Sequence, residues 1–399
     1  MKKLRLGIIG TCNRGKLGDI AHDVANGVEV VACADINDMQ RASCVERYKK
    51  EYNYDIHAYV DYREMIEKEH LDGVFVTSPD FCHEEHACFA LQNKVAVYLE
   101  KPLAITIEGA DRILRLAKDN KTKLMVGHNM RYMDFTNKMR EIIQSGAIGE
   151  VKAIWCRHFI SYGGDAYFRD WHADRANTTS LLLQKGAHDI DIIHWLADSS
   201  TVRVNGFGSL SVYGNLPRRA KGREKLECLT IKDIWSKNNW PPEEQTEMYP
   251  NINNEDINMI NMQLANGVQA CYQQCHFTPD CSRNYTVIGT KGRIENYGDC
   301  GVGATIQLWN RRTDTFVLEG DITYRMPDRS NDMHGGADPK IVRGFIEMLR
   351  GISKPASTPQ GARMAIAAGV KGAESIRSGG MPLDVPELAE DLKNYEFSC

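Results

Sequence analysis

The sequence predicts an α/β fold in which a doubly wound parallel sheet precedes an α+β domain with a large, mostly antiparallel open sheet. Three observations support this. Apolar strand runs alternate with helical patterns up to Gly127, and a glycine-rich turn follows the first run. After Gly149 the strand patterns instead alternate polar with apolar residues. We expect a first domain over residues 1–128 and a second over residues 129–399.

Length and charge limit the class of protein. A chain of 399 residues is long for a single hydrophobic core and suggests two domains. Its net charge of −4 is spread over both signs, and no basic run is longer than that at 217–223, so we expect neither nucleic acid nor a membrane as partner. The apolar residues after Lys2-Lys3 are too few for a signal peptide, which predicts a cytoplasmic protein.

Twelve cysteines are scattered through the chain, and we expect them to be reduced. Cys271, Cys275, His276 and Cys281 are the best candidates for a metal site. No second CxxC pair accompanies them, and an alternating strand explains the first two, so we predict no metal.

The first strand pattern, residues 4–10, leads into a dinucleotide-binding fingerprint. The loop reads Gly10-x-Cys12-x-x-Gly15, with cysteine in place of the middle glycine. The first glycine permits the turn, the last lets helix and strand pack closely, and the helix start offers amides to a pyrophosphate. Taken alone, a plain tight turn is the alternative. We expect the cofactor to be bound by Gly10, Thr11, Cys12, Asn13, Arg14 and Gly15.

The second strand, Val28 to Ala34, ends in Asp35, twenty residues after Gly15. A carboxylate there accepts hydrogen bonds from the adenosine ribose hydroxyls and repels a 2′-phosphate, which favours NAD over NADP. Arg41 offers the alternative, since a guanidinium can read a phosphate. We predict NAD as cofactor.

Glu100-Lys101-Pro102 closes a buried strand pattern at 95–99. Ligands of open α/β sheets lie outside the carboxyl ends of the strands, so a lysine there can face a bound cofactor, and proline fixes the turn. Thr77-Ser78-Pro79 ends another strand, and we expect both ends to converge with the glycine loop on one crevice. A surface lysine is the alternative, but we take Lys101 as catalytic and cofactor-contacting.

Residues 181–195 are helical in period and predict one helix with Gln184, His188 and Asp191 along one side. A histidine there can accept a hydroxyl proton near neutral pH while hydride leaves the carbinol carbon. We therefore predict His188 as catalytic, the alternative being a core histidine. Gln184 and Asp191 are expected to bind substrate.

Residues 162–172 mix aromatic, acidic and basic side chains. Aromatic faces against sugar C–H groups, with polar partners for hydroxyls, make a carbohydrate pocket, although surface loops also collect such residues. We expect Arg169, Trp171 and His172 to bind substrate, with His172 as a second candidate base. Farther on, Asp338 is expected to cap a helix.

The second domain is predicted to hold several strands, a long polar excursion and two closing helices. The excursion, residues 213–256, suggests a loop beside the active site or a subunit contact. The helices are expected at 339–349 and 360–376. The strands are expected at 151–160, 202–212, 257–264, 268–275, 285–289 and 306–310.

Taken together, the motifs resemble the family of glucose-fructose oxidoreductase, inositol dehydrogenase and MocA-like oxidoreductases over roughly the first two hundred residues. The motifs are Gly10-x-Cys12-x-x-Gly15, Asp35, Thr77-Ser78-Pro79 with His83 beyond, Val97 to Pro102, Asn129-Met130-Arg131-Tyr132, Gly146 to Val151 and Gly186 to Asp191. The resemblance implies an N-terminal Rossmann domain and adds His83, Glu100 and Asn129 to the cofactor site. It also implies a homodimer or homotetramer built on the second sheet. Gln184 departs from the family, which commonly has aspartate there, so the division of acid and base roles between Lys101 and His188 stays open.

The resulting hypothesis is an NAD-dependent oxidoreductase of carbohydrate metabolism that acts on a secondary hydroxyl of a sugar, glycoside or cyclitol. Lys101 and His188 would meet at one substrate oxygen. One alternative is an NAD-retaining glycosidase or lyase that acts through a transient 3-keto glycoside. The other is a sugar- or NAD-sensing regulator without catalysis.

Overall fold

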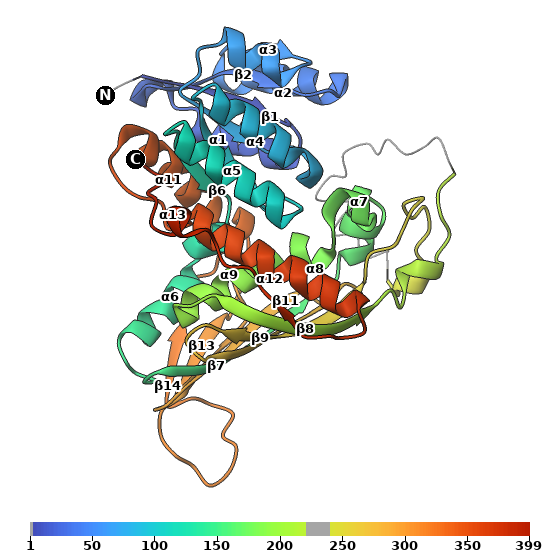
Figure 1. Ribbon diagram of the computed structural model, residues 1–399, viewed down its shortest axis with the longest axis vertical. Coiled ribbons are helices and arrows are strands. Elements are labelled where there is room, and N and C mark those ends of the chain that lie inside the picture. Colours follow the sequence, from blue (N-terminus) through green and yellow to red (C-terminus); the bar gives the residue numbers. More distant parts are fainter. Residues whose placement is uncertain (1–2, 221–239) are drawn as a thin grey trace. The chain divides into compact units, whose positions relative to one another are not determined.

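The structure is a computed structural model that describes residues 3–220 and 240–399 (Figure 1). The chain forms two compact units. The first contains the chain up to Tyr132 together with Gly336–Ile366 and Leu388–Cys399, and the second contains Met133–Gly335 and Ala367–Glu387. Two C-terminal segments that the sequence division assigned to the second domain therefore lie in the first unit.

The first unit is built on a six-stranded sheet in the order β3-β2-β1-β4-β5-β6, in which every neighbouring pair is parallel. Strands β2, β4 and β5 are buried along their whole length, which explains their continuous apolar runs. The strands are β1 (Leu4–Ile9), β2 (Val28–Ala34), β3 (His57–Tyr59), β4 (Gly73–Val76), β5 (Ala96–Leu99) and β6 (Leu124–Val126).

Helices alternate with these strands along the chain. Asn37, Asp61 and Thr106 cap the first turns of α2, α3 and α5 with their side chains, which explains where these helices begin. The helices of this unit are α1 (Leu17–Ala21), α2 (Asp38–Tyr52), α3 (Tyr62–Lys68), α4 (His83–Gln92), α5 (Ile107–Asp119), α11 (Ala337–Arg350) and α13 (Glu390–Lys393).

The second unit is built on a nine-stranded sheet in the order β14-β13-β12-β11-β7-β10-β9-β8-β15. Only β7 and β10 pair in parallel among its described strands, and the other neighbours are antiparallel. The predicted fold class is confirmed. The strands are β7 (Val151–Phe159), β8 (Thr201–Ser209), β9 (Ile257–Leu264), β10 (Gln269–Cys275), β11 (Ser282–Gly289), β12 (Arg293–Tyr297), β13 (Thr305–Trp309), β14 (Ile322–Arg325) and β15 (Leu383–Asp384).

Helix α9 (Gly186–Ala197) packs on β7 and β10 of this sheet. The prediction of one helix over 181–195 is wrong, because Lys185 separates α9 from the short α8 (Leu181–Gln184). The remaining helices are α6 (Asp134–Gln144), α7 (Arg175–Thr178) and α12 (Pro359–Arg377), which runs from the first unit into the second.

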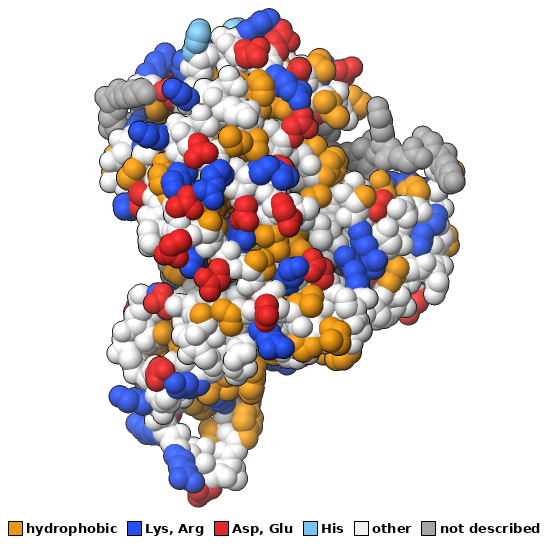
Figure 2. Space-filling model, in the orientation of Figure 1, with side chains coloured by type: hydrophobic (Ala, Val, Ile, Leu, Met, Phe, Trp, Pro, Cys, Tyr) orange, Lys and Arg blue, Asp and Glu red, His pale blue; other side chains and the backbone are white. Residues whose placement is uncertain are grey.

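Acidic and basic side chains are interspersed over the face shown in Figure 2. Each helix of residues 3–220 and 240–399 is too short or too polar to cross a bilayer.

Candidate active site

The glycine loop after β1 is held against the end of β4. Gly10 has φ +86°, and a Cβ there would lie 2.7 Å from the backbone nitrogen of Ser78. A Cβ on Gly15 would lie 2.7 Å from the carbonyl oxygen of Gly10. Thr77 donates its hydroxyl to that same carbonyl at 2.6 Å. The loop thus needs glycine at both predicted positions and is fixed by the Thr77-Ser78-Pro79 turn.

Asp35, at the end of β2, ties this loop to the neighbouring strand. Its Oδ2 accepts hydrogen bonds from the backbone nitrogen of Thr11 at 2.8 Å and from the Thr11 hydroxyl at 2.9 Å. Its Oδ1 accepts one from the Asn37 backbone at 2.9 Å. The carboxylate therefore orients the second residue of the loop and is itself fixed in place.

Cys12 replaces the middle glycine in an extended conformation (φ −77°, ψ 157°), directly before the turn η1 (Asn13–Lys16). Cys12 is disulfide-bonded, so the expectation that the cysteines are reduced is wrong at this position. The neighbouring Asn13 is exposed and has φ +38°.

Arg14 and Glu100, both predicted cofactor residues, are bound to each other. The Glu100 Oε1 lies 2.9 Å from Nε and 2.8 Å from Nη2 of Arg14, while Arg14 Nη1 lies 2.7 Å from Oδ2 of Asp338. Burial by itself would lower the pKa of Arg14, but the two carboxylates raise it above its usual value. The prediction that Asp338 caps a helix is wrong, because Gly336 is the N-cap of α11.

Lys101 lies two residues after the end of β5 and is half-buried. Its backbone nitrogen donates to Oε2 of Glu100 at 3.2 Å. His83, buried at the start of α4, places Nδ1 2.6 Å from the Pro102 carbonyl oxygen and Nε2 2.9 Å from that of Ser78. His83 therefore joins the Lys101 loop to the β4 turn, and the predicted convergence of the three strand ends is confirmed.

Two further predicted residues lie near these strand ends in sequence. Pro79 precedes the turn η3 (Asp80–Cys82), which leads into α4. Asn129 is buried after β6, at the start of η4 (Asn129–Tyr132), and its backbone nitrogen donates to Gly127 at 2.8 Å.

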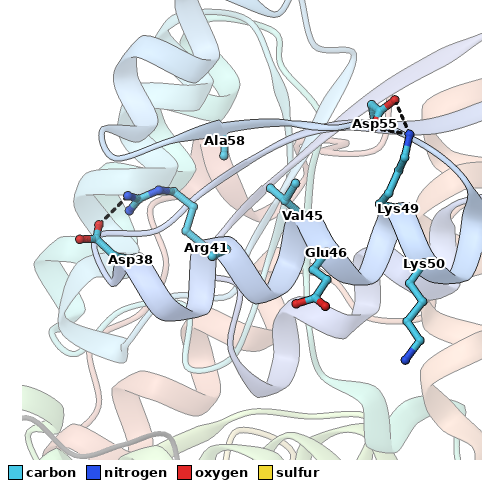
Figure 3. Close-up of a pocket in the computed structure, with 9 residues that line it drawn as sticks. Asp38, Arg41, Val45, Glu46, Lys49, Lys50, Asp55 and Ala58 are labelled. Carbon is cyan, nitrogen blue, oxygen red and sulfur yellow. Dashed lines mark hydrogen bonds and ion pairs between the residues drawn. The ribbon is translucent and has the colours of Figure 1, made fainter.

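Arg41, the residue that could favour NADP, lies in a surface pocket along α2 (Figure 3). Its Nη1 donates to the Asp35 carbonyl oxygen at 2.7 Å, and its Nη2 lies 2.5 Å from Oδ1 of Asp38. An acidic side chain thus already pairs with the guanidinium, which weakens the argument for a phosphate at this position.

The predicted substrate residues Gln184, His188 and Asp191 are all buried in the second unit. Gln184 ends α8, and the other two lie on α9. Since Lys185 interrupts the helix, Gln184 is not on the same continuous helix as His188. Lys101 belongs to the first unit, and its meeting with His188 stays a prediction.

Asp189, next to His188, is a fully buried residue that the sequence analysis missed. Its Oδ1 lies 3.0 Å from Nε of Arg283 and accepts a hydrogen bond from the Tyr285 hydroxyl. Its Oδ2 accepts one from the Tyr272 hydroxyl at 3.1 Å and lies 3.1 Å from Nδ1 of His158. One carboxylate thus joins α9 to strands β7, β10 and β11.

Burial in this network opposes charge on Asp189, yet the pKa of its carboxyl is lowered, because Arg283 and His158 favour the anion. Burial and the charge of Arg283 lower the pKa of His158 to about 3, although Asp189 acts in the opposite direction. At neutral pH the network therefore contains one anion, one guanidinium and a neutral imidazole.

The aromatic segment before α8 forms one connected cluster. Trp171 and His172 stack with ring centroids 3.6 Å apart, and Tyr167 meets His172 edge-on at 5.2 Å. Arg169 is tied down internally, since its Nη1 lies 2.9 Å from Oδ1 of Asp165 and its Nε donates to a backbone oxygen at 3.1 Å. His172 lies 3.5 Å from the carboxylate of Asp170.

Lys185 borders this cluster and was also missed. Its Nζ lies 5.5 Å from the ring centroid of Tyr162 and 5.8 Å from that of Tyr167. In sequence it is one lysine inside a helical pattern, and only the helix break marks it as unusual.

The described flanks of the 213–256 excursion pack on the aromatic segment. Tyr213 stacks on Phe168 at 4.4 Å, and Nη2 of Arg219 donates to the Arg169 carbonyl oxygen at 2.8 Å. The excursion is therefore beside the predicted carbohydrate pocket along these flanks. The rest of its basic run, residues 221–223, lies outside the described residues. Over the described ranges, no cluster of three or more His, Cys, Asp or Glu residues is arranged to hold a metal ion.

Two family models match this chain. Residues 4–128 match "Oxidoreductase family, NAD-binding Rossmann fold", and residues 136–295 match the "GFO/IDH/MocA C-terminal domain". The chain belongs to the GFO/IDH/MocA oxidoreductase family. Its N-terminal part is thus an NAD-binding Rossmann domain of that family, and the recognition made from the motifs is confirmed.

Individual members of the GFO/IDH/MocA family are distant relatives. The oxidoreductase YteT of Bacillus subtilis is 24% identical over 80% of this chain and 82% of its own length. An inositol 2-dehydrogenase of Serratia proteamaculans is 31% identical over 50% of this chain, and the match spans only 56% of that enzyme. A levoglucosan dehydrogenase solved with NADH and levoglucosan has a TM-score of 0.77 at 17% identity, covering 97% of this chain and all of that one, which shows a shared fold.

Proposed function

We propose that this chain is an NAD-dependent dehydrogenase that acts on a secondary hydroxyl of a sugar, glycoside or cyclitol. The observation that carries the proposal is the meeting of three strand ends in the first unit, where Lys101 lies two residues after β5. His83 and Glu100 fix its loop, beside a glycine loop that a Cβ at Gly10 or Gly15 would fill. Membership of a sugar and cyclitol dehydrogenase family supports the same assignment.

The residues at these strand ends fit a dinucleotide. Gly10 and Gly15 leave room for a close approach to phosphates, and Asp35 stands where ribose hydroxyls are bound in such folds. The pairing of Arg41 with Asp38 supports NAD rather than NADP. When bound, NAD supplies the ring that accepts or returns a hydride.

We assign the proton chemistry to Lys101 and His188. Oxidation of a carbinol removes a hydride from carbon and a proton from oxygen, so one group must take the proton and another must stabilise the developing negative charge. Imidazole suits the first task near neutral pH, and an ammonium suits the second. Gln184 can orient a hydroxyl but cannot carry a proton, which leaves His188 as acceptor.

The experiment is a turnover screen of the purified chain with NAD and a panel of hexoses, glycosides and cyclitols, followed by NADH absorbance. We expect NADH formation with at least one member and a lower rate when NADP replaces NAD. Release of an aglycone without net NADH would replace the proposal with the bond-cleaving alternative. Cofactor binding without any turnover over the panel would favour a regulator.

The outer face of the second sheet supports the proposal of a homodimer or homotetramer. Trp155 on β7, Met259 on β9 and Phe207 on β8 lie on that face and are 50%, 46% and 64% exposed. A second copy of the chain would remove these side chains from water.

A further inference from the structure

Lys185 is a cation whose setting the proposed hydride chemistry does not explain. It is half-buried at the break between α8 and α9, and its ammonium faces the rings of Tyr162 and Tyr167. Among the residues that the structure describes, no aspartate or glutamate forms an ion pair with it. A partly desolvated cation without an anion is costly unless something else supplies negative charge.

The charged neighbours of Lys185 are already used or carry no negative charge. Asp189 is bound to Arg283 at 3.0 Å, and Asp299 lies 3.9 Å from the same guanidinium. Burial raises the pKa of Tyr167 to about 12 although Lys185 lowers it, and burial also raises the pKa of Tyr162, so both hydroxyls are neutral. The local network therefore contributes no spare carboxylate to the lysine.

The nearby histidine side chains do not compensate the positive charge of Lys185 either. Burial lowers the pKa of both His158 and His276 to about 3, and the positive charge of Lys185 contributes to each shift. The positive charge of Lys185 therefore acts on two buried histidines of the second unit. Cation–π contacts with two tyrosines account for part of its stability. The Tyr167 hydroxyl also hydrogen-bonds to the lysine, and neither tyrosine carries a negative charge.

The aromatic cluster beside Lys185 is the segment predicted to receive the sugar. Tyr167 bridges the two, because its ring meets His172 at 5.2 Å and lies under the ammonium. A sugar packed on these rings would carry its substituents within reach of the lysine. Arg283 is not an equivalent candidate, since two carboxylates already engage it.

We propose that Lys185 is a specificity-determining residue that binds an anionic substituent of the sugar substrate, a carboxylate or a phosphate. This inference rests on the proposed function. It narrows the substrate class to acidic sugars, such as uronates or sugar phosphates. An ammonium recognises either group through charge-assisted hydrogen bonds.

The test is a matched panel of hexoses in gluco, galacto and manno configuration, each as the neutral sugar, the uronate and the 6-phosphate. For wild type we expect kcat/KM to be at least about tenfold higher for an acidic member than for its neutral counterpart. Preference for the uronate or for the phosphate identifies the source of the anion, and either supports the proposal. A neutral sugar used as well as both of its acidic counterparts would overturn it.

Variants separate the charge from the shape of the side chain. Lys185→Met should lower kcat/KM for the acidic member by about 10- to 100-fold, mainly through KM, and leave the neutral member within about twofold. Lys185→Arg should keep the preference. Lys152→Met is the control, because Lys152 pairs with Glu150 on the surface of the same unit. An equal loss for all three sugars in Lys185→Met would overturn the proposal.

A binding experiment distinguishes failure of the proposed function from failure of the inference about Lys185. If no panel member reduces NAD, calorimetric titration of the same sugars into wild type and Lys185→Met still tests the inference. Binding of an acidic sugar to wild type that weakens at least tenfold in Lys185→Met, but not in Lys152→Met, supports it. Wild type that binds no acidic member would overturn it.

Discussion

Lys101 stands at a position where a small change of chemistry should have a large effect. Its loop is fixed from both sides, by Glu100 at its backbone nitrogen and by His83 at the Pro102 carbonyl. These contacts involve backbone atoms of the loop, so removing the lysine side chain leaves them in place. Both of these contacts therefore remain when the ammonium is deleted.

Lys101→Ala should lower kcat by about 10²- to 10⁴-fold, the usual contribution of a positioned acid or base, while NADH affinity changes little. Steady-state kinetics and fluorescence titration with NADH measure the two effects. Lys50→Ala, on the exposed side of α2, is the control. Turnover in Lys101→Ala within a few-fold of wild type would contradict the assignment.

Asp35, which we propose selects the cofactor, also fixes the glycine loop, because its Oδ2 accepts two hydrogen bonds from Thr11. Asp35→Asn keeps an oxygen for these bonds and removes the negative charge. The ratio of kcat/KM for NAD to that for NADP should therefore fall by about 10- to 100-fold, the effect of losing one charged contact. An unchanged ratio would show that the carboxylate does not select the cofactor.

At the scale of elements, the glycine loop after β1 packs directly against the turn after β4. Gly10 has both a positive φ and a backbone neighbour at 2.7 Å from its would-be Cβ, whereas Gly27 has φ +70° and its nearest atom at 3.7 Å. A comparison of alanine variants at these two glycines therefore separates the cost of a positive φ from the cost of a steric clash.

Gly10→Ala should lower the free energy of unfolding by about 1 kcal/mol for the positive φ and by about 1–3 kcal/mol more for the clash. Gly27→Ala should show only the first effect. Urea denaturation measures both variants, and NADH affinity should fall in Gly10→Ala alone. Equal losses in the two variants would mean that the loop does not press against β4.

The elements that sequence could predict are those with a strong apolar pattern. Buried parallel strands such as β4 and β5 produce continuous apolar runs, so the alternation of the first unit was predicted. β3 and β14 are mostly exposed edge strands without such a run and were missed. The break at Lys185 was missed because the helical period continues across it.

The residues of the candidate site also divide into those that the sequence could predict and those that it could not. Gly10, Asp35 and Lys101 could be predicted to lie near one another because each follows the end of a parallel strand. Asp189 was missed because its partners are up to 96 residues away in sequence, and nothing local distinguishes it from a helix-surface aspartate. Arg14 and Glu100 were predicted as cofactor contacts, and sequence gave no sign that they bind each other.

At the scale of the whole molecule, two buried neutral histidines make stability depend on pH. Burial lowers the pKa of His158 and His276 to about 3, whereas an unfolded histidine titrates near 6.5. Between these values the unfolded chain binds protons that the folded chain does not. The stability is therefore fully present above about pH 6.5 and decreases as the pH falls toward about 3.

The free energy of unfolding should fall by up to about 1.4 kcal/mol per pH unit for each histidine between pH 6 and 4. Chemical denaturation over this range measures the slope. His158→Gln or His276→Gln should reduce it, and His334→Asn, which changes an exposed histidine of the same unit, should not. A slope that none of these changes alters would contradict burial of the neutral imidazoles.

Helix α11 supplies part of the core of the first unit. Phe345 contacts the rings of Phe75 and Tyr98 at 5.2 and 5.7 Å, and Ile341 is buried in the same core. During synthesis on the ribosome, the strands made first must wait for more than two hundred later residues before this core can close. An N-terminal fragment cut at the end of the parallel sheet would expose that apolar surface, so engineers who graft this nucleotide-binding module should transplant α11 with it.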